Sequence, residues 1–302
     1  MMRGMYAAIS GLQAHQTMLD VTANNLSNVD TIGYKAQRTT FVDQLSQEMR
    51  GASGPTANNG GTNPVQVGLG VQLGSIDNLM SGGSAQSTGN PLDLEIQGEG
   101  FFRVAPGDGT KVPSNFSYTR AGNFTTNTLG YLTTQQGTYV IGKNAVQGNA
   151  GPPYAYTTGA NDSYVVIPPG STGIAVGQDG SVTYVDQDPT HDPKNGATAP
   201  NDTYQTRVTA GYVSLATFPN QSGLERLGGS LWGATANSGA AKPGVPGVNG
   251  MGNTISGELE MSNVDMATEF TNMITAQRGY QAQSKVITTA DQMLQTLVQM
   301  GG

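Results

Sequence analysis

The two ends of the chain carry its best helical patterns, and this feature most constrains the fold. Over residues 262–302, side chains recur in steps of four and three at Met266, Phe270, Met273, Gln277, Tyr280, Ser284 and Ile287. The stripe then shifts to Ala290, Leu294 and Leu297. At about 1.5 Å per residue, this predicts a helix about 50 Å long. A helix of this kind needs a partner, because helix stability comes mostly from packing.

The only clear partner lies at the other end of the sequence. Residues 2–27 carry a 3.5-residue repeat at Met2, Met5, Ile9, Leu12, Gln16, Leu19, Ala23 and Leu26. Gly4 and Gly11 weaken this helix by roughly 1 kcal/mol each relative to alanine, so it is marginal alone. The repeat favours a coiled-coil-like seam, and an ordinary amphipathic helix on a globular core stays open as the alternative.

Cap residues and small polar residues set the expected ends of these helices. We expect Ser262 to be the N-cap of the final helix, with Asp265 as its capping-box-like partner. The first helix is expected to stop near Asn24–Asn28, before Gly33. Residues 39–50 place Phe41, Leu45 and Met49 at helical spacing, although an extended arm with a helical turn fits equally well.

The middle of the chain predicts an all-β domain with many short strands. Leu92, Leu94 and Ile96 alternate with Asp93 and Glu95, which we expect on a solvated strand face. Asp108-Gly109 and Asp179-Gly180 are turn signals between strands. The fold class is therefore α+β: terminal helices in a coiled-coil-like layer, with a sandwich or barrel-like β-domain inserted between them.

Composition excludes several functional classes. A net charge of −7 and a pI near 4.7 argue against nucleic acid or an anionic membrane surface as partners. The chain has no cysteine, which rules out disulfides and thiolate chemistry. No apolar run approaches the roughly 20 residues that span a bilayer, and no cleavable secretory signal is visible.

Catalytic and metal sites are equally poorly supported. His15 and His191 are the two histidines, too few for a histidine-based metal site or triad. Hard-cation ligands occur within residues 186–203, at Asp186, Asp188, His191 and Asp192. Their spacing fits no EF-hand loop, and Pro189 and Pro193 indicate an irregular loop. We expect no cofactor and no enzymatic activity.

Two terminal motifs resemble the bacterial flagellar rod and hook proteins. The N-terminal motif is Ala-Asn-Asn-x-Ser-Asn followed by Thr-x-Gly-Tyr-Lys, with Asn24, Asn25, Asn28, Gly33, Tyr34 and Lys35 at its marked positions. The C-terminal motif carries Ser262, Asn263, Asp265, Gln277 and Arg278. The segments LDLEIQGEGFFRV and YTRAGNF fit the same family, so the resemblance spans most of the chain.

The resemblance implies a structural subunit that is exported unfolded through the flagellar type III apparatus without a cleaved signal. Many copies would stack into a helical tube, with terminal helices around the channel. Expected partners are copies of itself, rod and hook–filament junction proteins, the hook cap and the export apparatus. The expected layers are residues 1–30 plus 262–302 inside, residues 31–90 plus 254–261 as an arm, and residues 91–253 outside.

Within the family, the sequence favours a compact extracellular hook protein over a distal rod protein. The alternative has its own support, because distal rod proteins carry an insertion after the position of Arg50 that is thought to stiffen the tube. Helix packing, within or between subunits, is expected from Met5, Ile9, Leu12, Leu19, Leu26, Phe270, Met273, Tyr280, Ile287, Leu294 and Leu297. A secreted adhesin or surface-layer protein, whose helices merely cap a β-domain, is the hypothesis from a different class.

Overall fold

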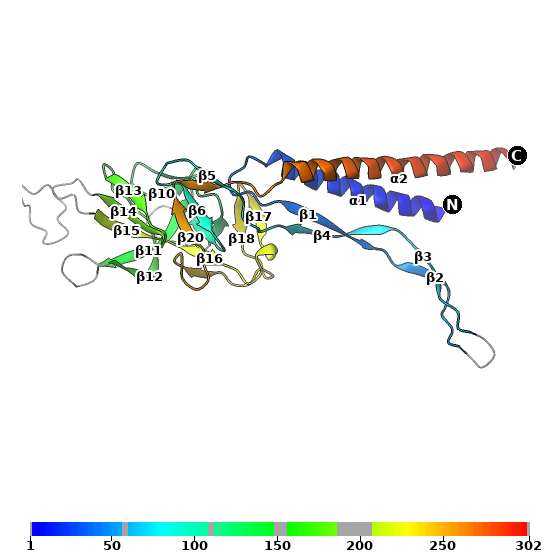
Figure 1. The fold of residues 1–302 in the computed structure, drawn as a ribbon, viewed down its shortest axis with the longest axis horizontal. Helices are drawn as coiled ribbons and strands as arrows, with labels where there is room; N and C mark the ends of the chain where they lie inside the picture. The colour runs from blue at the N-terminus through cyan, green and yellow to red at the C-terminus, as the bar shows by residue number, and fades with distance from the viewer. Residues whose placement is uncertain are drawn as a thin grey trace, which may run out of the picture. The chain divides into compact units, whose positions relative to one another are not determined.

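The chain folds into two compact units, whose elements are labelled in Figure 1. The computed structural model describes residues 2–55, 60–107, 112–113, 115–147, 156–185 and 207–300. Unit 1 comprises Met1–Val29, Ala36–Leu79 and Val264–Gly302, and unit 2 comprises Asp30–Lys35 and Met80–Asn263. The expected inner, arm and outer layers concern an assembled tube, and that division stays a prediction.

Unit 1 contains two long antiparallel helices. α1 spans Met2–Ser27 and α2 spans Met266–Met300. Figure 1 shows the N-terminal end of α1 and the C-terminal end of α2 at the same end of the unit. Asp265 begins α2: its Oδ1 accepts a hydrogen bond from the Ala267 amide at 3.0 Å, and its Oδ2 accepts one from the Thr268 hydroxyl at 2.6 Å. The prediction that Ser262 caps this helix is therefore wrong.

Unit 1 also contains a long two-stranded ribbon. β1 (Gln37–Asp43) pairs with β4 (Val71–Asn78), and β2 (Ser46–Arg50) pairs with β3 (Val65–Gly68), all antiparallel. A further bridge joins Ser53 to Thr62. The helical alternative for residues 39–50 is wrong, because β1 and β2 cover this segment except for Gln44 and Leu45. The run Thr39–Val42 is rich in β-branched and aromatic residues, which favour strands.

Unit 2 is built from short strands, as the middle of the sequence predicts. Most of them join one 13-stranded sheet whose main path is β13-β14-β15-β11-β7-β8-β18-β17. Two small sheets pair β20 with β6 and β21 with β5. The bounds are β5 (Ala85–Ser87), β6 (Leu94–Gln97), β7 (Phe101–Ala105), β8 (Ser117–Thr119), β9 (Phe124–Thr126), β10 (Leu132–Thr134), β11 (Tyr139–Gln147), β12 (Tyr156–Tyr164), β13 (Thr172–Val176), β14 (Ser181–Val185), β15 (Arg207–Val213), β16 (Leu215–Thr217), the 3₁₀ turn η1 (Gln221–Gly223), β17 (Glu225–Gly228), β18 (Leu231–Gly233), β19 (Lys242–Gly244), β20 (Asn253–Ser256) and β21 (Glu258–Glu260).

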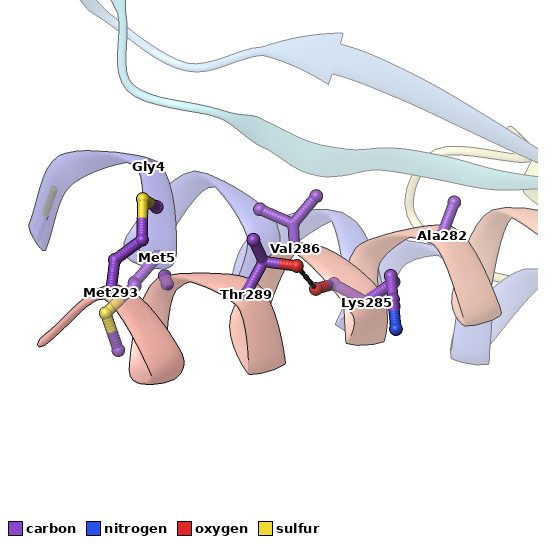
Figure 2. Close-up of a pocket in the computed structure, with 8 residues that line it drawn as sticks. Gly4, Met5, Ala282, Lys285, Val286, Thr289 and Met293 are labelled. Carbon is purple, nitrogen blue, oxygen red and sulfur yellow. Dashed lines mark hydrogen bonds between the residues drawn. The ribbon is translucent and has the colours of Figure 1, made fainter. Parts of the chain in front are cut away.

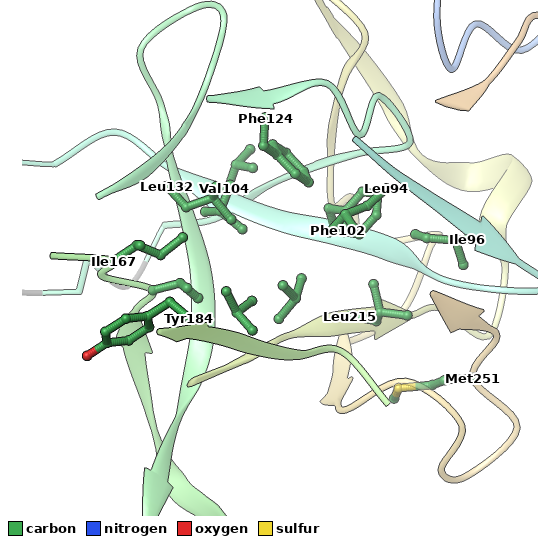
Figure 3. Close-up of a cluster of buried hydrophobic side chains, with 14 residues drawn as sticks. Leu94, Ile96, Phe102, Val104, Phe124, Leu132, Ile167, Tyr184, Leu215 and Met251 are labelled. Carbon is green, nitrogen blue, oxygen red and sulfur yellow. The ribbon is translucent and has the colours of Figure 1, made fainter. Parts of the chain in front are cut away.

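β7 organises the core of unit 2. It pairs with β11, β8 and β16, and all five of its residues are buried. Phe102, on one face of β7, stacks edge-on against Phe124 at a centroid distance of 5.0 Å, inside the apolar cluster shown in Figure 3. Phe101, on the other face, belongs to a second cluster with Tyr118, Phe218 and Trp232.

One predicted turn is confirmed and another lies outside the described residues. Asp179-Gly180 joins β13 to β14, and Gly180 has a φ of +76°, which favours glycine. Asp108-Gly109 falls outside the ranges given above. The α+β fold with a large β-domain is confirmed, whereas a coiled-coil-like layer is not.

Candidate functional site

Small residues let α1 and α2 approach closely. A Cβ added to Gly279 would lie 2.5 Å from ring atoms of His15, and one added to Gly11 would lie 3.0 Å from the Gln283 amide. Each glycine thus receives a side chain from the opposite helix. Ala8 and Ala14 of α1 are buried, and in α2 the buried residues are Ala276 and Ala290. This seam differs in kind from the bulky apolar seam that the sequence pattern suggests.

Asn25 ties the end of α1 to two other parts of unit 1. Its side-chain amide donates to the Gln37 carbonyl at 2.7 Å and accepts from the Gln37 amide at 2.9 Å. It also donates to Glu269 Oε1 in the first turn of α2 at 3.1 Å. Asn28 donates to the Asn24 carbonyl at 2.9 Å, where α1 ends. Asn25 therefore links the end of α1 to β1 and to the first turn of α2, whereas Asn28 bonds within the end of α1.

Most of the apolar residues expected to pack are left partly uncovered within the described chain. Ile9 is 41% exposed, Phe270 49%, Tyr280 36% and Leu297 53%. Met5, Leu12, Leu19, Leu26, Met273, Ile287 and Leu294 are of intermediate burial. Exposed apolar area of this extent marks an interaction surface. Packing of these residues between subunits stays a prediction.

An apolar groove opens between the two helices near the start of α1. It has a volume of about 540 Å³ and is lined by Gly4 and Met5 of α1 and by Ala282, Lys285, Val286, Thr289, Ala290 and Met293 of α2, most of which Figure 2 labels. A Cβ added to Gly4 would meet no atom within 4 Å, so this position borders open space. Both helices thus contribute to the wall of this hollow.

The ribbon carries a second group of uncovered apolar side chains. Leu45 lies just before β2, Met49 lies within β2, and Val67 of β3 lies opposite Gln47. Leu45 is 86% exposed and Met49 is 65% exposed. Between β3 and β4 the ribbon approaches α1 at Gly70, where an added Cβ would lie 3.3 Å from the Ala7 Cα. A two-stranded ribbon is marginal alone in water, so we expect these apolar side chains to be covered in an assembled state.

In unit 2, the remaining residues of the N-terminal motif surround a buried ion cluster. Gly33, at φ +66°, lies so close to Arg120 and Ala121 that a Cβ there would fall 2.6 Å from the Ala121 amide nitrogen. Lys35 is 1% exposed and pairs with Glu260, which also pairs with Arg120 at 3.1 Å. Lys35 donates as well to the Ser81 carbonyl at 2.8 Å. The buried charges are thus matched by partners on several strands and loops.

Burial and attraction act in opposite directions on these charges. Burial alone would raise the pKa of the Glu260 carboxyl, but the attraction of Arg120 and Lys35 outweighs it and lowers that pKa below its ordinary value. Burial lowers the pKa of Lys35, and the attraction of Glu260 opposes that shift. The ion pairs therefore offset part of the cost of burying these charges.

The Arg226 side chain also contacts Tyr34 and Lys35. The guanidinium of Arg226 lies 4.6 Å from the Tyr34 ring centroid and 4.9 Å from that of Trp232, and it donates to the Lys35 carbonyl. Tyr34 is 7% exposed and Trp232 is 3% exposed. The sequence does not predict Arg226, Arg120 and Glu260 as partners, because nothing in their local pattern signals contact with residues 33–35.

The residues of the C-terminal motif fall into three structural groups. Ser262 is buried in unit 2, and Asn263 donates from its side chain to the Ser81 carbonyl at 3.1 Å. Asp265 caps α2, and its two bonds to Thr268 and Ala267 lower its pKa. Gln277 and Arg278 are exposed on α2. The structure therefore does not gather the motif residues into one site.

The expectation of a solvated face for Asp93 and Glu95 is wrong. Asp93 is 9% exposed and accepts hydrogen bonds from Thr88 at 2.6 Å and Asn90 at 3.2 Å. Glu95 is 8% exposed because β20 pairs with β6, which places Ile255 opposite it. Burial, and then the proximity of Glu260 and Glu258, raises the pKa of Glu95. Alternation of apolar and polar residues in a strand thus does not imply that the polar face is exposed to solvent.

Within the described ranges, no group of three or more His, Asp or Glu side chains could hold a metal ion. The loop at residues 186–203 lies outside those ranges. None of the helices described is long and apolar enough to cross a membrane. The exposed apolar side chains described above lie on the helix pair and the ribbon of unit 1.

Three family models match parts of the chain. The chain matches the family models "Flagella basal body rod protein" over residues 5–35, "Flagellar hook protein FlgE/F/G D1 domain" over 95–184 and "Flagellar basal body rod FlgEFG protein C-terminal" over 255–300. It is 41% identical over 301 residues to the flagellar basal-body rod protein FlgG of Bacillus subtilis, with 99% of each chain covered. The chain belongs to the flagellar rod and hook axial protein family.

Further axial proteins also match over almost their full length. The basal-body rod protein FlgG of Caulobacter vibrioides is 36% identical over 301 residues, covering 99% of both chains. The flagellar hook protein FlgE of Borreliella burgdorferi is 29% identical over an alignment of 448 residues, covering 99% of this chain and all of the hook protein. This axial protein is a structural subunit of the flagellum and not an enzyme, because its family consists of proteins that polymerise into axial structures.

Proposed function

We propose that this chain is a subunit of the distal rod of the flagellar basal body, the drive shaft that transmits motor torque to the hook. The supporting observation is the end-to-end match with rod proteins. The alignment with the Bacillus subtilis rod protein covers 301 residues at 41% identity, with 99% of both chains aligned. The hook relative instead requires an alignment of 448 residues for a chain of 302, and so needs long gaps. This reverses the preference for the hook drawn from the sequence.

The ribbon supports the same choice. The insertion that the resemblance attributes to distal rod proteins would follow Arg50, and in this chain that position lies on the far part of the ribbon, beyond β1 and β4. Its uncovered apolar side chains, Leu45 and Met49, suit a brace against neighbouring subunits, which would oppose bending of the tube. The neighbours would be copies of this chain, with other rod proteins and the hook at the two ends.

A flexible hook subunit is the second candidate. It is favoured by the match of residues 95–184 to a domain named for hook proteins, although that model also covers rod proteins. Under both candidates the chain would be exported without a cleaved signal and would fold its terminal helices on assembly.

Immunogold labelling of purified basal bodies separates the two. Antibody against unit 2 should decorate the straight segment within the cell envelope. Label confined to the curved tube outside the envelope would overturn the rod proposal and support the hook. A deletion of the gene gives a second readout: basal bodies lacking the distal rod are expected, whereas complete rods without hooks would contradict the proposal.

A further inference from the structure

The chain passes between the two units at four places. The passages follow Val29, Lys35, Leu79 and Asn263, so residues 30–35 belong to unit 2 although unit 1 contains the residues on both sides of them. Elements of unit 1 lie close to these passages in sequence. β1 begins two residues after Lys35, and α2 begins three residues after Asn263. Because each residue extends the chain by at most about 3.6 Å, whatever fixes these stretches in unit 2 also limits where β1 and α2 can start.

The stretches of unit 2 next to the passages are bonded directly to one another. The Gly33 amide donates to the Glu260 carbonyl at 2.8 Å. The Lys35 ammonium donates to the Ser81 carbonyl at 2.8 Å, and the side-chain amide of Asn263 donates to the same carbonyl at 3.1 Å. The three stretches that lead to unit 1 therefore meet at one place inside unit 2.

Glu260 joins most of these contacts. Its Oε1 accepts from Lys35 and from the Gly83 amide, the latter at 3.0 Å, and its Oε2 accepts from Arg120 at 3.1 Å. All three charged side chains are almost completely buried, so salt screens their attraction only weakly. Apolar side chains of similar volume often stabilise a fold as well as buried charges do, whereas charged hydrogen bonds accept fewer geometries. The cluster therefore suits a role in fixing one arrangement of the three stretches.

We propose that the cluster formed by Lys35, Ser81, Arg120, Glu260 and Asn263, here called the connector clamp, makes unit 2 the template on which unit 1 becomes ordered. About 240 residues separate the end of α1 from the start of α2, so bringing the two helices together costs loop-closure entropy. Folding of unit 2 offsets this entropy loss in advance, because the closed clamp holds the stretches that lead into both helices. The inference goes beyond the proposed function, since the clamp acts in the same way in a rod or a hook subunit.

α2 is the element that most needs such a template. Only Ala276 and Ala290 of its 35 residues are buried, and a helix with so little burial is marginal. Its first turn is the costly step in forming it. Asp265, two residues after Asn263, caps that turn through its bond to the Ala267 amide. The closed clamp holds the chain just before this cap, so α2 can extend from a fixed starting point.

Hydrogen exchange in the monomeric full-length chain tests the template directly. Amides of residues 270–279 in α2 should exchange about tenfold or more slowly than amides of residues 287–296, which lie farther from the clamp. Asn263→Ala removes one donor of the clamp and should reduce this difference about threefold or more. It is preferred to Lys35→Met, because loss of a buried charge partner also destabilises unit 2. Equal exchange along α2 in the wild type, or a difference that Asn263→Ala leaves unchanged, would contradict the proposal.

Polymerisation gives a second measurement with a matched control. Asn263→Ala should raise the critical concentration about fivefold, the equivalent of one hydrogen bond. Asn220→Ala removes a similar bond elsewhere in unit 2, from the Asn220 side chain to the Asn237 carbonyl at 3.1 Å, and should polymerise like the wild type. Equal critical concentrations for Asn263→Ala and Asn220→Ala would overturn the proposal. The rod assignment would stand in that case, because immunogold labelling of the wild-type protein tests it separately.

Discussion

The two units of this axial protein differ in how much of their apolar surface the chain itself buries. In unit 2, large apolar side chains such as Phe101, Phe102 and Leu215 are completely buried, and even the charges of Lys35 and Glu260 are enclosed. In unit 1, α2 has 35 residues, of which only Ala276 and Ala290 are buried. Burial of apolar area is the main stabilising term in folding. Unit 2 is therefore expected to be stable in the monomer, and unit 1 is expected to depend on other copies.

Hydrogen exchange in the monomer should show the largest contrast between the units. Amides of β7 and β11 are expected to exchange roughly a thousandfold or more slowly than amides of α2, since only the former need global unfolding of a packed core. On polymerisation, α2 should gain protection, while unit 2 should change little. Equal protection of α2 and β7 in the monomer would contradict the contrast and would fit a self-contained protein with capping helices.

Removing a large core side chain should unfold unit 2 most effectively. Phe102→Ala is expected to cost about 4 kcal/mol, because it leaves a cavity beside Phe124. Trp232 is the single tryptophan and lies buried in unit 2, so its fluorescence in urea follows this unit specifically. The control Leu129→Ala, at a position 65% exposed, should stay within about 0.5 kcal/mol of the wild type.

Breaking the ion cluster should lower the free energy of unfolding of unit 2 slightly less than Phe102→Ala does. Lys35→Met removes one of the two cations on Glu260, and the loss of a buried partner is expected to lower the free energy of unfolding by about 3 kcal/mol. Urea unfolding followed by Trp232 fluorescence measures this loss. Lys242→Met changes an exposed lysine and is the matched control. An equal effect of both substitutions would show that the cluster contributes nothing specific.

The helix seam should respond to a single methyl group. Alanine at position 279 would favour the helix intrinsically, but its Cβ would collide with His15. Gly279→Ala should therefore lower the free energy that stabilises the polymer by about 1–3 kcal/mol per subunit, as measured by thermal disassembly. Gly11→Ala meets only the flexible end of Gln283 and should have a smaller effect. Combining Gly279→Ala with His15→Ala should recover most of the loss. A double variant as unstable as Gly279→Ala alone would exclude the close approach at this point.

Particular residues show what the sequence could and could not predict. The terminal helices, the β-rich middle and the Asp179-Gly180 hairpin follow from periodicity and turn chemistry, which are local. The periodicity of bulky apolar residues does not reveal the seam of Gly11 and Gly279, because helices that approach closely need small residues at their contact. Partners such as Arg226 for Tyr34, or Arg120 for Glu260, lie more than a hundred residues away in the chain. Only the fold brings them together.

Glu95 provides the smallest test, and the sign of its effect distinguishes a buried carboxylate from a solvated one. Its folded-state pKa is raised, so the ionised form is disfavoured in the native state; the resulting cost is absent below the ordinary pKa of about 4.5 and is complete above the raised value. Glu95→Gln should therefore stabilise unit 2 by roughly 1 kcal/mol at pH 7 and by almost nothing at pH 4. Glu260, whose pKa is lowered, has the opposite effect: its stabilisation is present at neutral pH and is lost as pH falls through its folded-state pKa.

The control for Glu95→Gln is Glu99→Gln, which changes an exposed carboxyl and should shift the urea midpoint at neither pH. If Glu95→Gln behaves like Glu99→Gln, the carboxyl of Glu95 is solvated in the working protein, and the tight core ascribed to unit 2 does not extend to this strand.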